Sequence, residues 1–244
     1  MINCIDLMLR YLQEAFIGFW LQPSAKQYQQ FACFYEYLLE VNHRMNLTRI
    51  TEPMDVAVKH FFDSVLVLQP DKIQYGATLA DIGTGAGFPG IPLAIMRPDL
   101  NIVLIDSLNK RTRFLLEVVE MLSLDFVEVV HSRAEDFARD SRYREHFDFS
   151  MARAVAPLNV LAEYCMPLIK VGGMFIAMKG PRAQEEVEVA QKSIRILGGG
   201  KSVIRVEELP LINESRVIIQ IYKTKKTPLL YPRKPGLPEK QPLK

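Results

Sequence analysis

The stretch Leu79-Ala80-Asp81-Ile82-Gly83-Thr84-Gly85-Ala86-Gly87-Phe88-Pro89-Gly90 decides the fold. An apolar run leads into three alternating glycines, and a second apolar run, residues 91–96, follows them. This order predicts a buried strand, a tight glycine turn and the first turn of a helix. Glycine suits the turn because it adopts backbone angles closed to other residues and lets a ligand approach the main chain. Pro92 suits a helix start, where its missing N–H costs nothing.

The spacing of these glycines indicates which ligand the turn would bind. The dinucleotide pattern is Gly-x-Gly-x-x-Gly, but here the third glycine falls at Gly87, and Phe88 fills the position that the pattern reserves for a small residue. Asp81 precedes the first glycine by two residues, and acid-x-Gly-x-Gly-x-Gly resembles the first motif of S-adenosylmethionine (SAM) methyltransferases. An acidic residue here suits the ammonium and sulfonium charges of SAM better than it suits a pyrophosphate.

A second apolar strand, residues 101–106, ends in an acid that completes the pattern. Asp106 follows Gly87 by 19 residues. In a βαβ unit this spacing places the carboxylate beside the glycine turn, where it can accept both ribose hydroxyls. The alternative is an ordinary loop acid or helix N-cap. Because both motifs occur in a strand–turn–helix–strand context, we expect a nucleoside cofactor.

Length and composition bound the class of protein. The chain has 244 residues, of which 49% are apolar, enough for the core of one large α/β domain with a small appendage. It contains no uncharged apolar run of the ~18 residues that cross a membrane. Cys4, Cys33 and Cys165 are scattered without a Cys-x-x-Cys pair, which argues for reduced thiols and against a zinc site. We therefore expect a cytoplasmic monomer without a metal and without a membrane partner.

The net charge of +2 hides an asymmetry. From Lys223 onward the chain has seven basic residues and one acid, a charge of +6, so residues 1–222 carry −4. A basic tail is either a solubilising end or a site for a polyanion. We expect its prolines to hold the tail extended, its cations to follow a phosphate backbone and its tyrosine to stack on a base. The candidate RNA-binding residues are Lys225, Lys226, Tyr231, Arg233 and Lys234.

The pattern along the chain predicts three parts: an N-terminal helical cap, residues 1–70; a cofactor-binding domain, residues 71–224; and the basic, proline-rich tail, residues 225–244. Alternating βαβα units after the cap predict a doubly wound, mostly parallel, seven-stranded sheet, and the Pro210 turn predicts one antiparallel strand at an edge. A sheet with such a reversed strand resembles the Rossmann-like fold of SAM-dependent methyltransferases. The expected strands are 78–83, 101–106, 126–131, 147–152, 173–179, 202–208 and 216–223. The expected helices include 4–20, 24–41, 53–68, 90–97, 109–122, 133–139, 157–169 and 182–197.

Ligands in such sheets gather at the carboxyl ends of the strands, so the residues there are the candidates. The resemblance to SAM methyltransferases implies that Ala134 and Glu135 border the adenine. Alternatively, they are simply the start of a helix whose dipole favours acids. Arg153, a lone cation in an apolar stretch, should lie at the pocket mouth near the methyl-transfer point. His60 and Asp63 share one face of a predicted helix. They either satisfy each other at the junction of cap and sheet or line the substrate pocket.

Missing motifs narrow the acceptor. No Asn/Asp-Pro-Pro-aromatic sequence, typical of amine methylation, follows the fourth strand. Cys165 lies in a predicted helix without a nearby cation to lower the pKa of its thiol, which disfavours carbon methylation. Lys179 is the one candidate for deprotonating a hydroxyl. By elimination the acceptor is a nitrogen with a free lone pair, for which orientation supplies most of the catalysis.

Several motifs together resemble one family. They are Asn46-Leu47-Thr48, His60-Phe61-Phe62-Asp63-Ser64, the glycine stretch, Asp106-Ser107-Leu108-Asn109-Lys110-Arg111, Ala152-Arg153-Ala154-Val155-Ala156 and Tyr231-Pro232-Arg233-Lys234-Pro235-Gly236. From about Asn42 to the C-terminus the chain is similar to the GidB/RsmG family, bacterial 16S ribosomal RNA methyltransferases acting on guanine N7. The resemblance implies SAM contacts at Gly83, Phe88, Ala134, Glu135 and Arg153, with Asp106 near the ribose. It also implies that the tail and the cap loop meet ribosomal RNA of the small subunit.

We therefore expect transfer of a methyl group from SAM to guanine N7, with candidate cofactor-binding residues Asp81, Gly83, Gly85, Gly87, Phe88, Asp106, Ala134, Glu135 and Arg153. Arg153 would contact the guanine O6 or a phosphate, because its charge repels the cation formed at N7. His60, Asp63 and Lys179 are further candidates for the pocket. The alternatives are a nicotinamide-dependent oxidoreductase, a non-catalytic RNA-binding factor and a small-molecule methyltransferase, the last of which leaves the basic tail unexplained.

Overall fold

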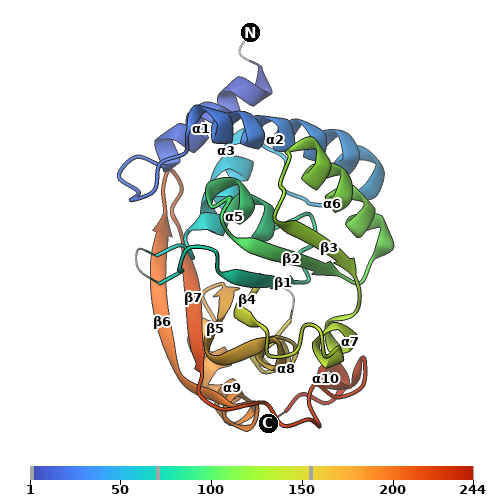
Figure 1. Cartoon of the computed structure of the whole chain (residues 1–244). Helices are drawn as coiled ribbons and strands as arrows, with labels where there is room; N and C mark the ends of the chain where they lie inside the picture. The colour runs from blue at the N-terminus through green and yellow to red at the C-terminus, as the bar shows by residue number, and fades with distance from the viewer. Residues whose placement is uncertain (1–2, 70–71, 154–155, 244) are drawn as a thin grey trace.

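A seven-stranded sheet with the order β3-β2-β1-β4-β5-β7-β6 lies at the centre of the molecule in Figure 1. The computed structural model describes residues 3–69, 72–153 and 156–243. The strands β1 to β5 run parallel, and β7 alone is reversed, pairing antiparallel with both β5 and β6. The strands are β1 Thr78–Ile82, β2 Asn101–Asp106, β3 Val127–His131, β4 Phe147–Arg153, β5 Ile169–Lys179, β6 Gly199–Leu209 and β7 Glu214–Lys223. The expected fold class is confirmed, with the reversed strand second from the edge.

Helices cover both faces of the sheet because each connection between parallel strands crosses over one face. One face is covered by α5 and α6, the other by α7, α8 and α9 (Figure 1). Their bounds lie close to those expected: α5 Gly90–Met96, α6 Asn109–Met121, α7 Ala134–Arg139, α8 Leu158–Cys165 with the short helix η2 Met166–Leu168, and α9 Ala183–Ile196.

The N-terminal helices pack over α5 and α6 as a further layer. Helix α1, Cys4–Ala15, ends before the expected residue 20, and α2, Ala25–Met45, continues past Val41. Ser24 caps α2 by accepting from the Gln27 backbone N–H, and the side-chain oxygen of Gln27 accepts a hydrogen bond from the Ser24 backbone N–H. Phe31, Phe34 and Leu38 of α2 are fully buried in one core with the apolar residues of α5 and α6. The cap and this face of the sheet therefore share a hydrophobic core.

The third helical segment differs from the expected regular helix. It begins as α3, Pro53–Asp55, widens into a π-helix, η1 Val56–Phe62, and ends as α4, Asp63–Val65. A π-helix advances by i→i+5 hydrogen bonds, so it changes the rotation between neighbouring residues. His60 and Asp63, at its end, are both buried. None of the helices in residues 3–69, 72–153 and 156–243 is long and apolar enough to cross a membrane.

The C-terminal segment, residues 224–243, packs against the rest of the protein. It was expected to be extended, but it is not. It contains turns and the short helix α10, Leu237–Lys240. Arg144 donates hydrogen bonds to the carbonyls of Thr227 and Tyr231, and Asn159 donates to that of Leu243. These contacts fix the segment at both ends, beside α8.

Candidate functional site

Asp81 holds the glycine turn in place through two hydrogen bonds. Its Oδ2 accepts hydrogen bonds from Thr84 Oγ1 at 2.7 Å and from the backbone N–H of Gly90 at 2.9 Å. A Cβ on Gly90 would lie 2.1 Å from Leu104, so only glycine fits there. Asp81 is fully buried, and burial raises its pKa to about 6. Its described hydrogen bonds brace the turn, and Asp81 lines none of the three cavities described below, so a direct cofactor contact stays a prediction.

The three alternating glycines all have positive φ angles, at 68°, 63° and 95° for Gly83, Gly85 and Gly87. A Cβ on Gly85 would meet nothing closer than the Gly83 carbonyl at 3.9 Å, because the residue faces open space. At Gly87 it would lie 2.6 Å from Ile91, so this glycine allows the helix to pack behind the turn. Gly85 therefore keeps the cavity open, whereas Gly87 serves packing.

Asp106 lies beside the turn, as the strand spacing predicts. Its Oδ2 accepts hydrogen bonds from the backbone N–H of Gly85 at 3.0 Å and from Arg111 Nη1 at 3.3 Å. Its Oδ1 accepts a hydrogen bond from the backbone N–H of Leu108. Each carboxylate oxygen has two lone pairs, so these three donors leave one acceptor position, on Oδ1, for a ribose hydroxyl. The acid is buried at the shared wall of two cavities.

Three adjoining cavities follow the carboxyl ends of the strands. The turn cavity, about 520 Å³, is lined by Gly83, Gly85, Phe88 and Asp106, together with Leu47 and Thr48 of the cap. The side cavity, about 120 Å³, contains Ala134 and Glu135 and shares Gly83 and Asp106 with the turn cavity. The open cavity, about 730 Å³, shares His60 and Arg153 with the turn cavity. An elongated ligand can therefore extend from Glu135 past the glycines to Arg153.

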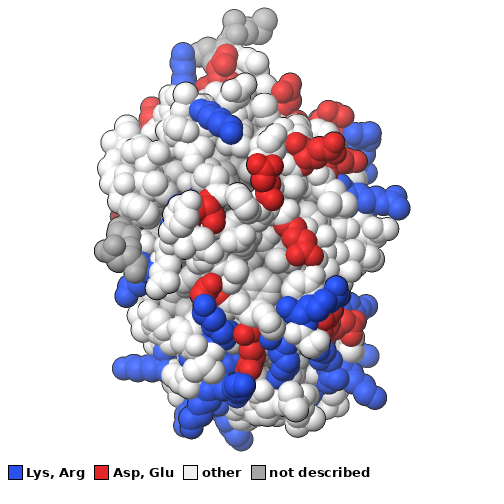
Figure 2. Space-filling view, viewed as in Figure 1, with Lys and Arg blue, Asp and Glu red and all other residues white. Residues whose placement is uncertain are grey.

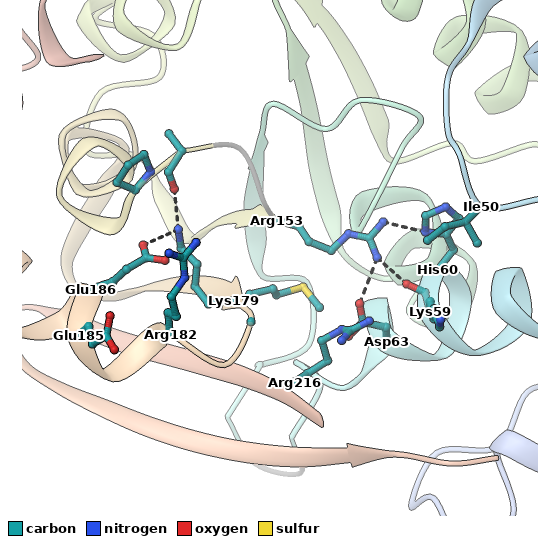
Figure 3. A pocket seen from close by; sticks show the side chains of 14 residues that line it. Ile50, Lys59, His60, Asp63, Arg153, Lys179, Arg182, Glu185, Glu186 and Arg216 are labelled. Atoms are coloured by element: carbon teal, nitrogen blue, oxygen red, sulfur yellow. Dashed lines mark hydrogen bonds and ion pairs between the residues drawn. The ribbon is translucent and has the colours of Figure 1, made fainter. Parts of the chain in front are cut away.

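Arg153 joins the cap to the sheet at the boundary of the turn and open cavities (Figure 3). Its Nη1 donates to the Lys59 carbonyl at 3.0 Å and to Asp63 Oδ2 at 3.2 Å, and its Nη2 donates to His60 Nδ1 at 3.2 Å. The guanidinium also lies 4.9 Å from the centre of the Phe88 ring, a cation–π distance. The described hydrogen bonds use three of its five N–H groups.

His60 is held as a neutral imidazole. Since arginine can only donate, His60 Nδ1 is the acceptor, and its Nε2 carries the proton that points to Thr48 Oγ1 at 2.8 Å. Burial and the charge of Arg153 lower the pKa of His60 to about 3. Its ring stacks on Phe88, with centroids 4.3 Å apart. In the described hydrogen bonds His60 and Asp63 meet through Arg153 and not directly, which differs from the simpler of the two expectations.

Two residues from outside the predicted set complete this cluster. Arg216 of β7 lies 3.3 Å from Asp63 Oδ1, so that Asp63 lies between two arginines. Lys59 forms ion pairs with Asp55 and with Glu214 at 2.8 Å. Arg216 directly precedes the apolar run 217–219 of β7, and a cation beside such a run was the available signal.

Lys179 lines the open cavity, but its side chain is engaged. Its Nζ donates to the Ala156 carbonyl at 2.5 Å and pairs with Glu186 at 2.7 Å, while Glu186 also accepts from Leu158 N. Lys179 thus holds the chain that follows β4. Two residues of the expected motif there, Ala154 and Val155, lie outside the described residues. Cys165 is fully buried, and burial raises the pKa of its thiol.

The predicted RNA-binding residues divide into two groups. Lys225, Lys226 and Lys234 are exposed. Arg233, in contrast, is bound by the completely buried Glu163, with Nη2 and Oε2 2.7 Å apart, and the Tyr231 ring packs against the core beneath α8. The signal for the Arg233 pair was a glutamate within the apolar run 158–165, which needs a cation. RNA contact by any of these residues stays a prediction.

The sheet order and the glycine turn at the carboxyl ends are those of the Rossmann-like methyltransferase fold. Solved structures with this fold include a predicted O-methyltransferase from Agrobacterium tumefaciens, with TM-score 0.52 and 16% identity, covering 68% of this chain and 81% of that one. A SAM-dependent O-methyltransferase from Thermotoga maritima has TM-score 0.50 and 14% identity, covering 78% and 72%.

The chain belongs to the GidB family, described as rRNA small subunit methyltransferase G, whose model matches residues 27–212. A relative from Lactobacillus acidophilus, named ribosomal RNA small subunit methyltransferase G, is 50% identical over 90% of this chain and 92% of its own length. A relative of the same name from Desulforamulus reducens is 50% identical over 87% and 89%. The family expected from the motifs is confirmed.

Proposed function

We propose that this enzyme transfers a methyl group from SAM to N7 of a guanine in 16S ribosomal RNA. The observation that carries the proposal is the row of three cavities, with Arg153 and His60 at the boundary of the last two. The family and the names of the relatives support ribosomal RNA of the small subunit as the substrate.

The residues present fit SAM at four points. The open position at Gly85 leaves the main chain accessible, and Asp106 Oδ1 has one lone pair left for a ribose hydroxyl. Ala134 and Glu135 line the side cavity, where the base would lie, and Phe88 and Arg153 line the opposite end. When bound, SAM supplies an electrophilic methyl group on a sulfonium. Gly83 and Gly87 shape the turn, and Asp81 braces it.

The acceptor would enter from the open cavity. Guanine presents O6 and N7 as acceptors on one edge, and arginine is the residue that most often reads that edge. Arg153 keeps N–H groups available for O6 beyond its three described hydrogen bonds. Guanine N7 already has a free lone pair, so no base is required. A neutral His60 agrees with this chemistry, since it adds no charge near the methylated, cationic ring.

The RNA would cover the lower end of the face shown in Figure 2, where Lys and Arg gather over the region of α9, α10 and the C-terminal segment. Exposed Lys225, Lys226 and Lys234 belong to that segment. Cations on such a surface bind phosphates without regard to sequence. We place the enzyme in the bacterial cytoplasm as a monomer, which light scattering of the purified chain tests.

Methyl transfer from labelled SAM tests the proposal. The purified chain is incubated with naked 16S ribosomal RNA and with small subunits lacking the modification, and the labelled nucleotide is mapped by nuclease digestion. The expected product is 7-methylguanosine at one position. The matched control is the same RNA transcribed with 7-deazaguanosine, which has carbon in place of N7 and should accept no label. Label on the deaza RNA would overturn N7 as the acceptor, and label on no RNA would overturn the substrate.

A further inference from the structure

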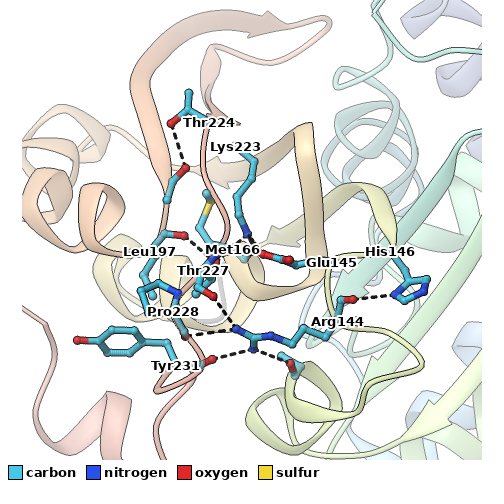
Figure 4. A network of polar contacts seen from close by, with 12 residues as sticks. Arg144, Glu145, His146, Met166, Leu197, Lys223, Thr224, Thr227, Pro228 and Tyr231 are labelled. Carbon is cyan, nitrogen blue, oxygen red and sulfur yellow. Dashed lines mark hydrogen bonds and ion pairs between the residues drawn. The ribbon is translucent and has the colours of Figure 1, made fainter.

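The C-terminal segment, residues 224–243, is docked by a series of buried polar contacts. Its first anchor is shown in Figure 4: Lys223 Nζ donates to Thr227 Oγ1 at 2.7 Å, and Thr227 Oγ1 donates to the Leu197 carbonyl at 2.7 Å. Arg144 holds the next stretch through the carbonyls of Thr227 and Tyr231. A tail that only carried charge would not need anchors of this kind.

The middle anchor is the ion pair of Arg233 and Glu163. The guanidinium meets both carboxylate oxygens, with Nε to Oε1 at 2.8 Å and Nη2 to Oε2 at 2.7 Å, and the Arg233 backbone N–H also donates to Oε1. Glu163 has no exposed surface. A bidentate pair with a buried carboxylate fixes position as well as charge, so it sets where the following residues lie.

The following residues reach the side cavity. The backbone N–H of Gly236 donates to Glu135 Oε1 at 2.8 Å, and Glu135 is buried. Gly236 and Glu239 line the side cavity together with Gly83, Asp106 and Tyr164. The wall of this cavity therefore comes from the glycine turn and from the C-terminal segment, which are far apart in the sequence.

We propose that the C-terminal segment is the outer wall of the base-binding end of the cofactor site, and that Glu135 couples cofactor binding to docking of the segment. The inference rests on the cofactor placement proposed above and adds Gly236, Glu239 and Tyr164 to the site. Its ligand is the purine base of a nucleoside cofactor. An exocyclic amine on that base is a donor, and carboxylates are the acceptors at this wall.

Coupling follows from the single hydrogen bond between Glu135 and Gly236. Undocking the segment would break the hydrogen bond between the Gly236 N–H and Glu135 and remove Gly236 and Glu239 from the cavity wall, so a ligand held by this wall would lose contacts. A ligand that binds only the docked state stabilises docking, and docking raises affinity for that ligand by the same factor. Burial and the nearby carboxylates of Glu135 and Glu239 raise the pKa of Tyr164, in agreement with their gathering at one place.

Hydrogen–deuterium exchange of the full chain with and without S-adenosylhomocysteine tests the coupling. The expected result is slower exchange both at residues 83–90 and at residues 233–241. Slower exchange at 83–90 alone would overturn the proposal, because the segment would then be independent of the cofactor. Unchanged exchange at both would overturn the cofactor placement itself, and this inference with it.

Two matched pairs of variants test the residues by calorimetric titration with S-adenosylhomocysteine. Glu135→Ala removes the acceptor of the Gly236 N–H and should lower affinity about tenfold or more, whereas Glu135→Gln keeps an acceptor oxygen and should restore most of it. Glu239→Ala should lower affinity, whereas Lys240→Ala, its exposed neighbour in α10, should not. Equal affinities within each pair would overturn the proposal, and thermal melts establish that all four variants fold.

Discussion

The Nη2 of Arg153 donates a hydrogen bond to His60 Nδ1 over 3.2 Å, linking strand β4 to the π-helix of the cap. The same imidazole donates from Nε2 to Thr48 in the loop that lines the turn cavity. One neutral ring therefore connects the two layers that line the turn and open cavities. The protonation state of His60 is thereby tied to the stability of the site.

The first prediction concerns acid pH. An unfolded histidine takes up its proton below about pH 6.5, whereas burial and Arg153 lower the pKa of folded His60 to about 3. Between these two pH values the unfolded state binds more protons than the folded state. As the pH is lowered through this range, the contribution of His60 to the unfolding free energy should therefore fall by up to about 1.4 kcal/mol per pH unit. Urea unfolding of wild type and His60→Asn at a series of pH values measures this.

Subtraction of the variant is needed because Asp81 acts in the opposite direction: its pKa is raised to about 6, so its protonation favours the folded state below that pH. His43→Asn, at an exposed position of α2, is the control and should leave the pH slope unchanged. An unchanged slope in His60→Asn would show that His60 is not buried neutral.

The second prediction separates strain from cavity filling at Gly85. Gly85 and Gly76 have φ angles of +63° and +71°, and a Cβ on Gly76 meets nothing within 4 Å. Alanine at either position should therefore cost a similar ~1 kcal/mol of stability. Only Gly85→Ala should also lower affinity for S-adenosylhomocysteine, by about tenfold or more, because only Gly85 lines the turn cavity. Equal affinities of the two variants for S-adenosylhomocysteine would show that the cofactor does not bind in the turn cavity.

The third prediction concerns the fork geometry of Arg153. Arg153→Lys keeps the charge but cannot reach the Lys59 carbonyl, Asp63 and His60 together, so single-turnover methyl transfer should fall about 100-fold. Arg216→Lys, which changes the second arginine on Asp63, should cost less than about tenfold. Full turnover by Arg153→Lys would remove this residue from the catalytic site. Thermal melts of both variants control for folding.

The fourth prediction concerns the exposed lysines of the C-terminal segment. Lys225→Ala with Lys226→Ala should weaken RNA binding and lower the slope of log affinity against log salt by about one to two. Cofactor affinity should not change. Arg10→Ala with Lys26→Ala removes the same charge from exposed positions on α1 and α2 and should leave the slope unchanged. Identical slopes for both double variants would exclude a phosphate contact at Lys225 and Lys226.

Local sequence patterns predicted the sheet well, because each strand and each helix has its own hydrophobic periodicity. Asp106 could be placed beside the glycine turn because the length of a βαβ unit is nearly constant. The π-helix Val56–Phe62 could not be foreseen, since its seven residues are nearly all buried and apolar and carry no mark of a wider turn.

Contacts between distant residues were beyond the sequence patterns. Glu163 and Arg233 are 70 positions apart, so the apolar run around Glu163 indicates that it needs a cation but not which one. The sharing of Arg153 among Lys59, His60 and Asp63 depends equally on the packing of the cap over the sheet. Such pairs are fixed by tertiary structure, so the sequence identified the chemical groups of the site without their partners.

The reversal of β7 sets a length requirement on the rest of the chain. Because β7 runs against β5, Lys223 lies at the amino end of the parallel strands, while Gly236 must meet Glu135 at their carboxyl end. Residues 224–235 must therefore span the sheet from the amino to the carboxyl ends of its parallel strands. Removing two or three of them would separate Gly236 from Glu135 while leaving both residues intact.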